Sequence, residues 1–144
     1  MNFRQIEYGS AEYDAARELR EAVLRAPLGL SLSANDLRGE EHQLHYALFT
    51  GTDELVGCVI VVPASDGQAR IRQMAIAPVH QRQGLASRMM LELEANVIAR
   101  GFCSLSLHAR RSAIGFYQKL GYECSGGEFI EVTLPHRKMS KRLT

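Results

Sequence analysis

A strand, a short loop and an amphipathic helix follow one another without interruption between residues 68 and 100. Residues 68–76 have strand character, Pro78 begins a turn, and Gly84 opens a helix whose apolar face carries Leu85, Met89, Leu93 and Val97. Such a junction exposes the first backbone N–H groups of the helix at the positive end of its dipole. The pattern predicts a seat for a phosphate group, although a single glycine here is also typical of a plain tight turn.

The loop from Gln81 to Ala86 differs from the two best-known phosphate motifs. No Gly-Lys-Ser/Thr is present, which excludes a Walker loop. One glycine, preceded by an apparent antiparallel meander, does not make a dinucleotide fingerprint. Gly84 allows a phosphate to come close to the backbone, since it carries no side chain. The polar and positive groups of the loop are those of Gln81, Arg82 and Gln83.

The other elements complete one domain over residues 1–144. Apolar patterning predicts strands at 3–8, 44–50, 54–63, 68–76 and 102–107, with one or two more over 122–134 and 138–143. Helices are expected at 11–25, 84–100 and 113–120, the last with Ser112 as its N-cap, and a helical turn within 33–41. The fold class is therefore α/β (α+β): a mixed, mostly antiparallel sheet of six to seven strands with helices on both faces.

Composition excludes several classes of protein. The 144 residues are 46% hydrophobic and 23% charged, as in a soluble globular domain. A net charge of +1 provides no broad field for nucleic acid or an anionic membrane. No apolar run approaches the ~20 residues of a membrane span, so we expect a cytoplasmic protein. Neither a metal site nor a disulfide framework is expected from three scattered cysteines: Cys58, Cys103 and Cys124.

A second informative segment runs from Ala113 to Tyr122. Phe116 and Leu120 fit the buried side of a short helix that Gly121 would end. Tyr117, next to Phe116, points away from that buried side of the helix. Its hydroxyl group could donate a proton to a leaving group.

Together the two segments resemble the GCN5-related N-acetyltransferase (GNAT) family. The acetyl-CoA signature of that family is Gln or Arg, two residues, Gly, one residue, and Gly or Ala; the matching residues are Gln81, Gly84 and Ala86. The hydrophobic-x-Pro lead-in is present as Ile76-Ala77-Pro78. The later family segment is matched by Ala113, Phe116, Tyr117, Gly121 and Tyr122. The resemblance extends from about Gln68 to Tyr122.

The resemblance implies a cofactor site for acetyl-CoA and no metal. The strand before the loop would splay from its neighbour and bind the pantetheine arm through the backbone of Met74, Ala75 and Ile76. The pyrophosphate would be held by the segment Gln81, Arg82, Gln83, Gly84, Leu85, Ala86 and Ser87. Tyr117 would assist the departing CoA thiolate. The family often has Asn where Arg110 stands, so Arg110 or Arg111 could meet a CoA phosphate instead.

Candidate residues for binding and deprotonating the acceptor come from the C-terminal tail, the first helix and the remaining histidines. The tail resembles the Phe-x-Glu-x-x-x-Pro-His-x-x-Met ending of a bacterial branch of the family, through Phe129, Glu131, Pro135, His136 and Met139. Glu131 is a candidate general base or a solvent-facing glutamate, and His136 a candidate acceptor ligand or a turn cap. Arg20 and Arg25 could meet an acidic group of the acceptor or be solvated. The weaker candidates are His42, His45 and His108.

These features predict an acetyl-CoA-dependent N-acetyltransferase that acts on a primary amine of a small-molecule acceptor by direct attack. The alternatives are a non-catalytic CoA-binding regulatory module and a protein N-terminal or lysine acetyltransferase. The last would favour an acidic acceptor groove, and the chain has no acidic run. A homodimer through the C-terminal strands is a further expectation, from family habit.

Overall fold

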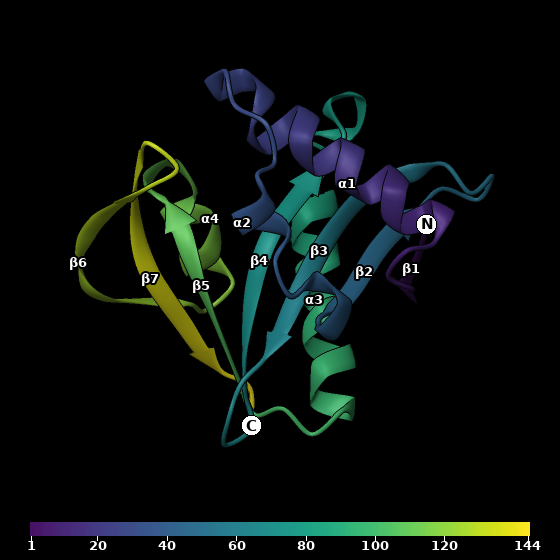
Figure 1. The fold of residues 1–144 in the computed structure, drawn as a ribbon. Helices are drawn as coiled ribbons and strands as arrows, with labels where there is room; N and C mark the ends of the chain where they lie inside the picture. Colours follow the sequence, from purple (N-terminus) through teal and green to yellow (C-terminus); the bar gives the residue numbers. More distant parts are fainter.

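Seven strands form one mixed sheet with the order β1-β2-β3-β4-β5-β7-β6 (Figure 1). The computed structural model describes all residues from Met1 to Thr144. The strands are β1 Asn2–Ile6, β2 Leu44–Phe49, β3 Leu55–Pro63, β4 Gln68–Ile76, β5 Ser104–Arg110, β6 Glu123–Glu131 and β7 Leu134–Arg142. The α-helices are α1 Ala11–Leu24, α2 Ala34–Leu37, α3 Leu85–Ala99 and α4 Ile114–Lys119. None of the helices is both long enough and apolar enough to cross a membrane.

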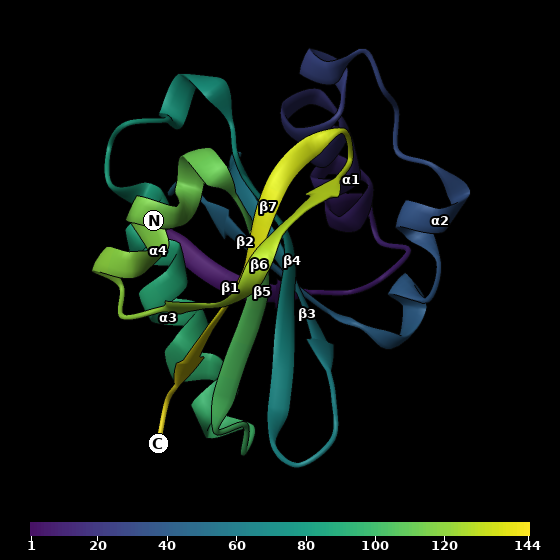
Figure 2. The ribbon, with the colours of Figure 1, turned by 90° about the vertical axis from the view of Figure 1, so that its left-hand side faces the viewer.

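Helices cover both faces of the sheet, as the sequence predicted. Figure 2 shows α3 and α4 on one side and α1 and α2 on the other. The larger core packs under α3, whose side chains Met89, Leu93 and Val97 are fully buried. A smaller cluster lies under α1 and contains Ile6, Ala16, Ala47, Phe49, Cys58 and Ala75. The sheet is therefore held rigidly from both sides.

β4 and β5 are the only parallel neighbours, and they soon separate. Their pairing is limited to Gln68–Arg70 with Ser104–Ser106. From there β5 continues alongside β7, with Arg110 opposite His136, while β4 continues alongside β3. Figure 1 shows the two strands meeting near the C-terminus and diverging toward their carboxyl ends. The sheet thus opens between them, as the family resemblance implied.

A β-bulge lies in β4 at the start of this gap. The register with β3 shifts between Cys58 and Ile60, and Gln73 has φ of 50°. The Nε of Arg20, on α1, donates to the side-chain oxygen of Gln73 at 2.6 Å. Because Arg20 is 1% exposed and paired with the fully buried Glu40, it anchors the bulge rather than meeting an acceptor or solvent. That sequence-based expectation for Arg20 was wrong.

Two local predictions near the C-terminus were also wrong. Ser112 does not cap α4: it lies inside a 3-10 turn, Arg111–Ala113, and Ala113 precedes the helix without a side-chain cap. The last hairpin turns at Val132 and Thr133, not after residue 134. Both residues have positive φ, of 50° and 65°. β-Branched residues are rare in that conformation, so the sequence contained no turn signal there.

Candidate functional site

The loop before α3 presents a row of unpaired backbone donors. The N–H groups from Arg82 to Ser87 donate to no protein atom, and no side chain caps the helix. Arg82 and Gly84 have φ of 63° and 75°, which gives the loop a curved backbone able to surround an anion. The side chain of Gln81 fixes the loop to β4 by donating to the carbonyl oxygen of Ile76 at 3.0 Å. Six neighbouring unpaired N–H groups at a helix start are an arrangement that favours anions.

A cleft of about 420 Å³ lies in front of this loop, and we call it the phosphate cleft. Its lining is Val23, Met74, Ala75, Ile76, His80, Gln81, Arg82, Gly84, Leu85, Ala86, Ser87 and Phe116. All the sequence-predicted cofactor residues lie here except Gln83, whose side chain donates to the Val79 carbonyl oxygen instead. Val23 and His80 were not foreseen, and Arg110 and Arg111 do not line this cleft.

The end of β4 directs free backbone groups into the gap. Ala77 donates its N–H to the carbonyl oxygen of Val56, on the β3 side. Backbone groups alternate in direction along a strand, so the N–H of Ile76 points the opposite way, toward the missing neighbour. β5 does not pair there, which leaves this donor available to a ligand.

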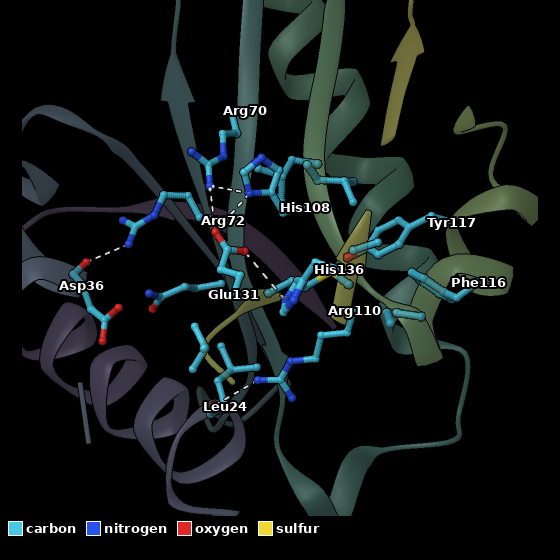
Figure 3. A pocket seen from close by; sticks show the side chains of 18 of the residues that line it. Leu24, Asp36, Arg70, Arg72, His108, Arg110, Phe116, Tyr117, Glu131 and His136 are labelled. Atoms are coloured by element: carbon cyan, nitrogen blue, oxygen red, sulfur yellow. Dashed lines mark hydrogen bonds and ion pairs between the residues drawn. The ribbon is translucent and has the colours of Figure 1, made fainter. Parts of the chain in front are cut away.

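A second cleft, of about 400 Å³, opens on the far side of the gap, and we call it the acceptor cleft. Met74, Ala86 and Phe116 line both clefts, so the two are contiguous. The other residues around the acceptor cleft include Leu24, Arg25, Asp36, Arg70, Arg72, Leu107, His108, Ala109, Arg110, Tyr117, Glu131, Val132 and His136. Figure 3 shows how these side chains converge from β4, β5, α4 and the last hairpin.

Tyr117 reaches the acceptor cleft from α4. Its side chain is 8% exposed and packs edge-on against Phe116 and Tyr122, with ring centroids 4.9 and 5.8 Å away. Its hydroxyl group has no hydrogen-bond partner in the protein, unlike that of Tyr122, which donates to Glu94 at 2.8 Å. Burial raises the pKa of Tyr117 to about 12. The phenol is therefore protonated at neutral pH and free to donate to a ligand.

Glu131 lies on the opposite side of the cleft between two imidazoles (Figure 3). One oxygen is 3.1 Å from Nδ1 of His108 and 4.0 Å from Arg70, and the other is 3.8 Å from Nε2 of His136. His136 is 5% exposed, and its Nδ1 faces the Leu134 carbonyl oxygen at 2.9 Å. A carbonyl oxygen can only accept, so that bond requires a proton on Nδ1, and Nε2 is the ring nitrogen that faces Glu131.

Arg25 was expected to meet an acidic group of the acceptor or to be solvated; it lines the acceptor cleft, but its guanidinium is paired within the protein. It forms a two-point ion pair with Asp36, at 3.1 and 3.3 Å, and is 6% exposed. Burial alone would raise the pKa of Asp36, but hydrogen bonds from Arg25 and Ser33 outweigh it and lower that pKa. Arg25 is therefore not available to an acidic acceptor.

Sequence reasoning missed most of the basic lining. Arg70 and Arg72 were not singled out, although their alternation on β4 puts them on one face of the sheet. His108 was treated as structural, yet it contacts both Arg70 and Glu131. Other histidines lie elsewhere: His42 is exposed, and His45 is buried against the Glu40 carbonyl oxygen.

The structure is that of an α/β protein in which a loop of unpaired backbone N–H groups borders one cleft, and that cleft continues into a second one at a gap in the sheet. Comparison with known proteins gives this class a name. A family model described as "Acetyltransferase (GNAT) domain" matches residues 16–143. The chain therefore belongs to the GNAT acetyltransferase family, and its enzyme class is that of an acyltransferase.

This chain is also similar to individual proteins of known sequence or structure. The Bacillus subtilis protein "Putative acetyltransferase BSU40680" is 32% identical over an alignment 151 positions long, which covers 99% of this chain and 97% of that protein. YyaT of the same organism is 35% identical over 89 residues, 57% of this chain and 60% of its own length. A Lactobacillus plantarum crystal structure superimposes with a TM-score of 0.88 at 23% identity, covering 100% of both chains. An aminoglycoside 6'-N-acetyltransferase complexed with coenzyme A has a TM-score of 0.77 at 16% identity, covering 100% and 98%.

Proposed function

We propose that this protein is an acetyl-CoA-dependent N-acetyltransferase that acetylates a primary amine of a small molecule. The observation that carries the proposal is the row of unpaired N–H groups from Arg82 to Ser87, which suits a pyrophosphate. The fold relative that was crystallised with coenzyme A supports the same ligand. In this proposal the backbone from Met74 to Ile76 binds the pantetheine arm, and Arg82 offsets phosphate charge.

The proposed reaction is direct attack. The nitrogen lone pair of a neutral amine forms a bond to the thioester carbon, and the carbon–sulfur bond then breaks to release the thiolate. The N–H of Ile76 is available to stabilise the negative charge that develops on the carbonyl oxygen. Binding both substrates in contiguous clefts supplies much of the rate by holding them close together.

Tyr117 is the proposed hydrogen-bond donor to the departing sulfur. A phenol with a pKa of about 12 is a weaker acid than a thiol, whose ordinary pKa is about 8.5. Complete transfer of its proton to a free thiolate is therefore uphill. The role that fits is a hydrogen bond from the phenol that strengthens as negative charge builds on sulfur, while the proton stays on the tyrosine.

Glu131 is the proposed proton acceptor for the amine, directly or through a water molecule. It borders the same cleft as Tyr117, on the opposite side. Nε2 of His136 lies 3.8 Å from the second oxygen of this carboxylate. His136 would in addition contact the acceptor.

Two measurements test the proposal. Calorimetry should detect acetyl-CoA binding, and release of free CoA thiol should then follow on addition of an amine from a chemically varied panel. Binding without turnover on any small amine or peptide would favour a regulatory CoA-binding module. Turnover on peptide N-termini or lysines alone would favour a protein acetyltransferase. Absence of acetyl-CoA binding would refute the shared premise.

A further inference from the structure

We propose that the acceptor amine also carries a carboxylate, and that Arg110 binds it. This inference rests on the proposed function and names the substrate class of the same site. The argument depends on which arginines of the acceptor cleft already have partners and which one does not.

The acceptor cleft is lined by four arginines and only two carboxylates. Three of the arginines are engaged by acidic groups. Arg25 pairs with Asp36 at 3.1 Å, Arg72 pairs with the buried Glu40 at 3.2 Å, and Arg70 lies 4.0 Å from Glu131. Arg110 has no carboxylate within ion-pair distance, so its charge is the one left uncompensated.

The hydrogen bonds of Arg110 lead to the same conclusion. Its guanidinium makes one protein contact, donating through one terminal nitrogen to the carbonyl oxygen of Leu24 at 3.0 Å. Its remaining N–H groups have no protein acceptor. Burial and the nearby charge of Arg25 lower the pKa of Arg110. Both effects mean that an unpaired cation at this position is unfavourable in free energy. A bound anion would remove that cost.

The location of Arg110 indicates that its ligand is part of the acceptor rather than of the cofactor. Arg110 lines the acceptor cleft and not the phosphate cleft. His108 and Arg110 alternate with the buried Leu107 and Ala109 along β5, so the two polar side chains project on the face opposite the main core. Figure 3 shows Arg110 reaching toward Leu24 of α1, away from Tyr117 and Phe116.

The chemistry of the arginine favours a carboxylate. A guanidinium presents parallel donors whose spacing matches the two oxygens of one carboxylate. A cleft of about 400 Å³ is suited to a small molecule, and its basic lining disfavours a second cationic group on the acceptor. The inferred acceptor is therefore a small amino acid or a related amino carboxylate.

The test uses matched pairs of acceptors, each an amino acid and its carboxamide, in a thiol-release assay with acetyl-CoA. The carboxylate member should have a kcat/KM higher by about 10- to 100-fold, the range of a charge-assisted hydrogen bond. Arg110→Gln should bring this ratio close to one by raising KM for the carboxylate member alone, and Arg110→Lys should restore part of it. Equal turnover of both members by the unaltered protein would overturn the proposal.

Arg111→Gln is the matched control. Arg111 neighbours Arg110 but is exposed, paired with Glu128 at 2.6 Å, and outside both clefts. The control should leave the ratio unchanged. If Arg110→Gln instead lowered turnover of both members equally, with a lower melting temperature, Arg110 would be a structural tie and the proposal would be wrong. Preference for ethanolamine phosphate over every amino acid would also refute it, in favour of a phosphate.

A binding experiment separates this inference from the proposed function. Calorimetric titration of the CoA-loaded protein with the same amino acids and carboxamides requires no turnover. If no amine is acetylated but the amino acids bind and Arg110→Gln abolishes their binding, the acetyltransferase proposal is wrong and the carboxylate site is correct. If amines are acetylated but neither the unaltered protein nor Arg110→Gln distinguishes a carboxylate from a carboxamide, the acetyltransferase proposal is correct and the carboxylate site is wrong.

Discussion

Arg25 and Arg110 donate hydrogen bonds to the same atom, the carbonyl oxygen of Leu24, at 3.2 and 3.0 Å. This oxygen lies at the C-terminal end of α1, the negative end of the helix dipole, which favours cations. The shared contact joins α1 to the end of β5 across the opening of the sheet. Two like charges therefore lie close together around one carbonyl oxygen.

Gly84→Ala should weaken acetyl-CoA binding by tenfold or more. Gly84 has φ of 75°, a conformation that costs an alanine about 1–2 kcal/mol. Apart from its chain neighbours, no protein atom lies within 4 Å of the added methyl group, so the methyl group enters open space at a residue that lines the phosphate cleft. The free energy of unfolding and the Kd for acetyl-CoA are the quantities to measure.

Gly101→Ala serves as the control for backbone strain. Gly101 follows the C-cap of α3 with φ of 95°, and a Cβ added there would meet no atom within 4 Å other than those of its chain neighbours. A similar loss of stability with an unchanged Kd is expected. If both variants weakened acetyl-CoA binding equally, the effect of Gly84 would be general destabilisation rather than loss of a phosphate contact.

Tyr117→Phe should lower turnover by about 10- to 100-fold and leave the Kd for acetyl-CoA nearly unchanged. Its melting temperature should also be unchanged, because the hydroxyl group has no partner in the protein. Tyr122→Phe provides the contrast: it removes the donor to the buried Glu94 and should cost about 1–3 kcal/mol of stability without a specific effect on turnover. Normal turnover in Tyr117→Phe would remove this tyrosine from the mechanism.

Arg20→Leu should reduce the free energy of unfolding by about 3–5 kcal/mol, since it leaves the buried carboxylate of Glu40 with one cation fewer. Adding Glu40→Gln should recover part of this loss. Arg17→Leu, an exposed change on the same helix, should have an effect below about 0.5 kcal/mol. Denaturant unfolding measures all three, and equal small effects of Arg20 and Arg17 would contradict the importance of the buried pair.

Stability should fall as the pH rises from about 10 to about 12. Burial, together with the hydrogen bond to Glu40, raises the pKa of Tyr13 from 10.0 to about 12. A raised folded-state pKa contributes stability that is complete below pH 10 and disappears as the pH passes the folded value. Tyr13→Phe should be less stable at neutral pH but show a shallower alkaline decline in denaturant titrations. An identical decline in both proteins would exclude Tyr13 as a contributor.

The sequence predicted the elements around the phosphate cleft better than the polar contacts around the acceptor cleft. The bounds of β4 and the start of α3 after Gly84 follow from local patterns. Residues that are close in sequence determine such patterns. The roles of Arg20 and Arg25 depend on Glu40 and Asp36, carboxylates that the chain brings close only after folding. Local patterns contain no information on such pairs, so both arginines were interpreted as free.

The last hairpin offers the converse case, a turn whose sequence opposes its structure. Glu131 pairs with Leu134, which leaves Val132 and Thr133 as a two-residue turn with positive φ at both positions. Asn-Gly is the preferred sequence for such a turn. Replacing Val132→Asn and Thr133→Gly together should raise the free energy of unfolding by about 1 kcal/mol or more through relief of backbone strain. The single change Thr133→Gly is the control for effects on the acceptor cleft. Val132 lines that cleft, whereas Thr133 is exposed and does not line it. A melting temperature that is unchanged or lower in both variants would show that this turn stores no strain.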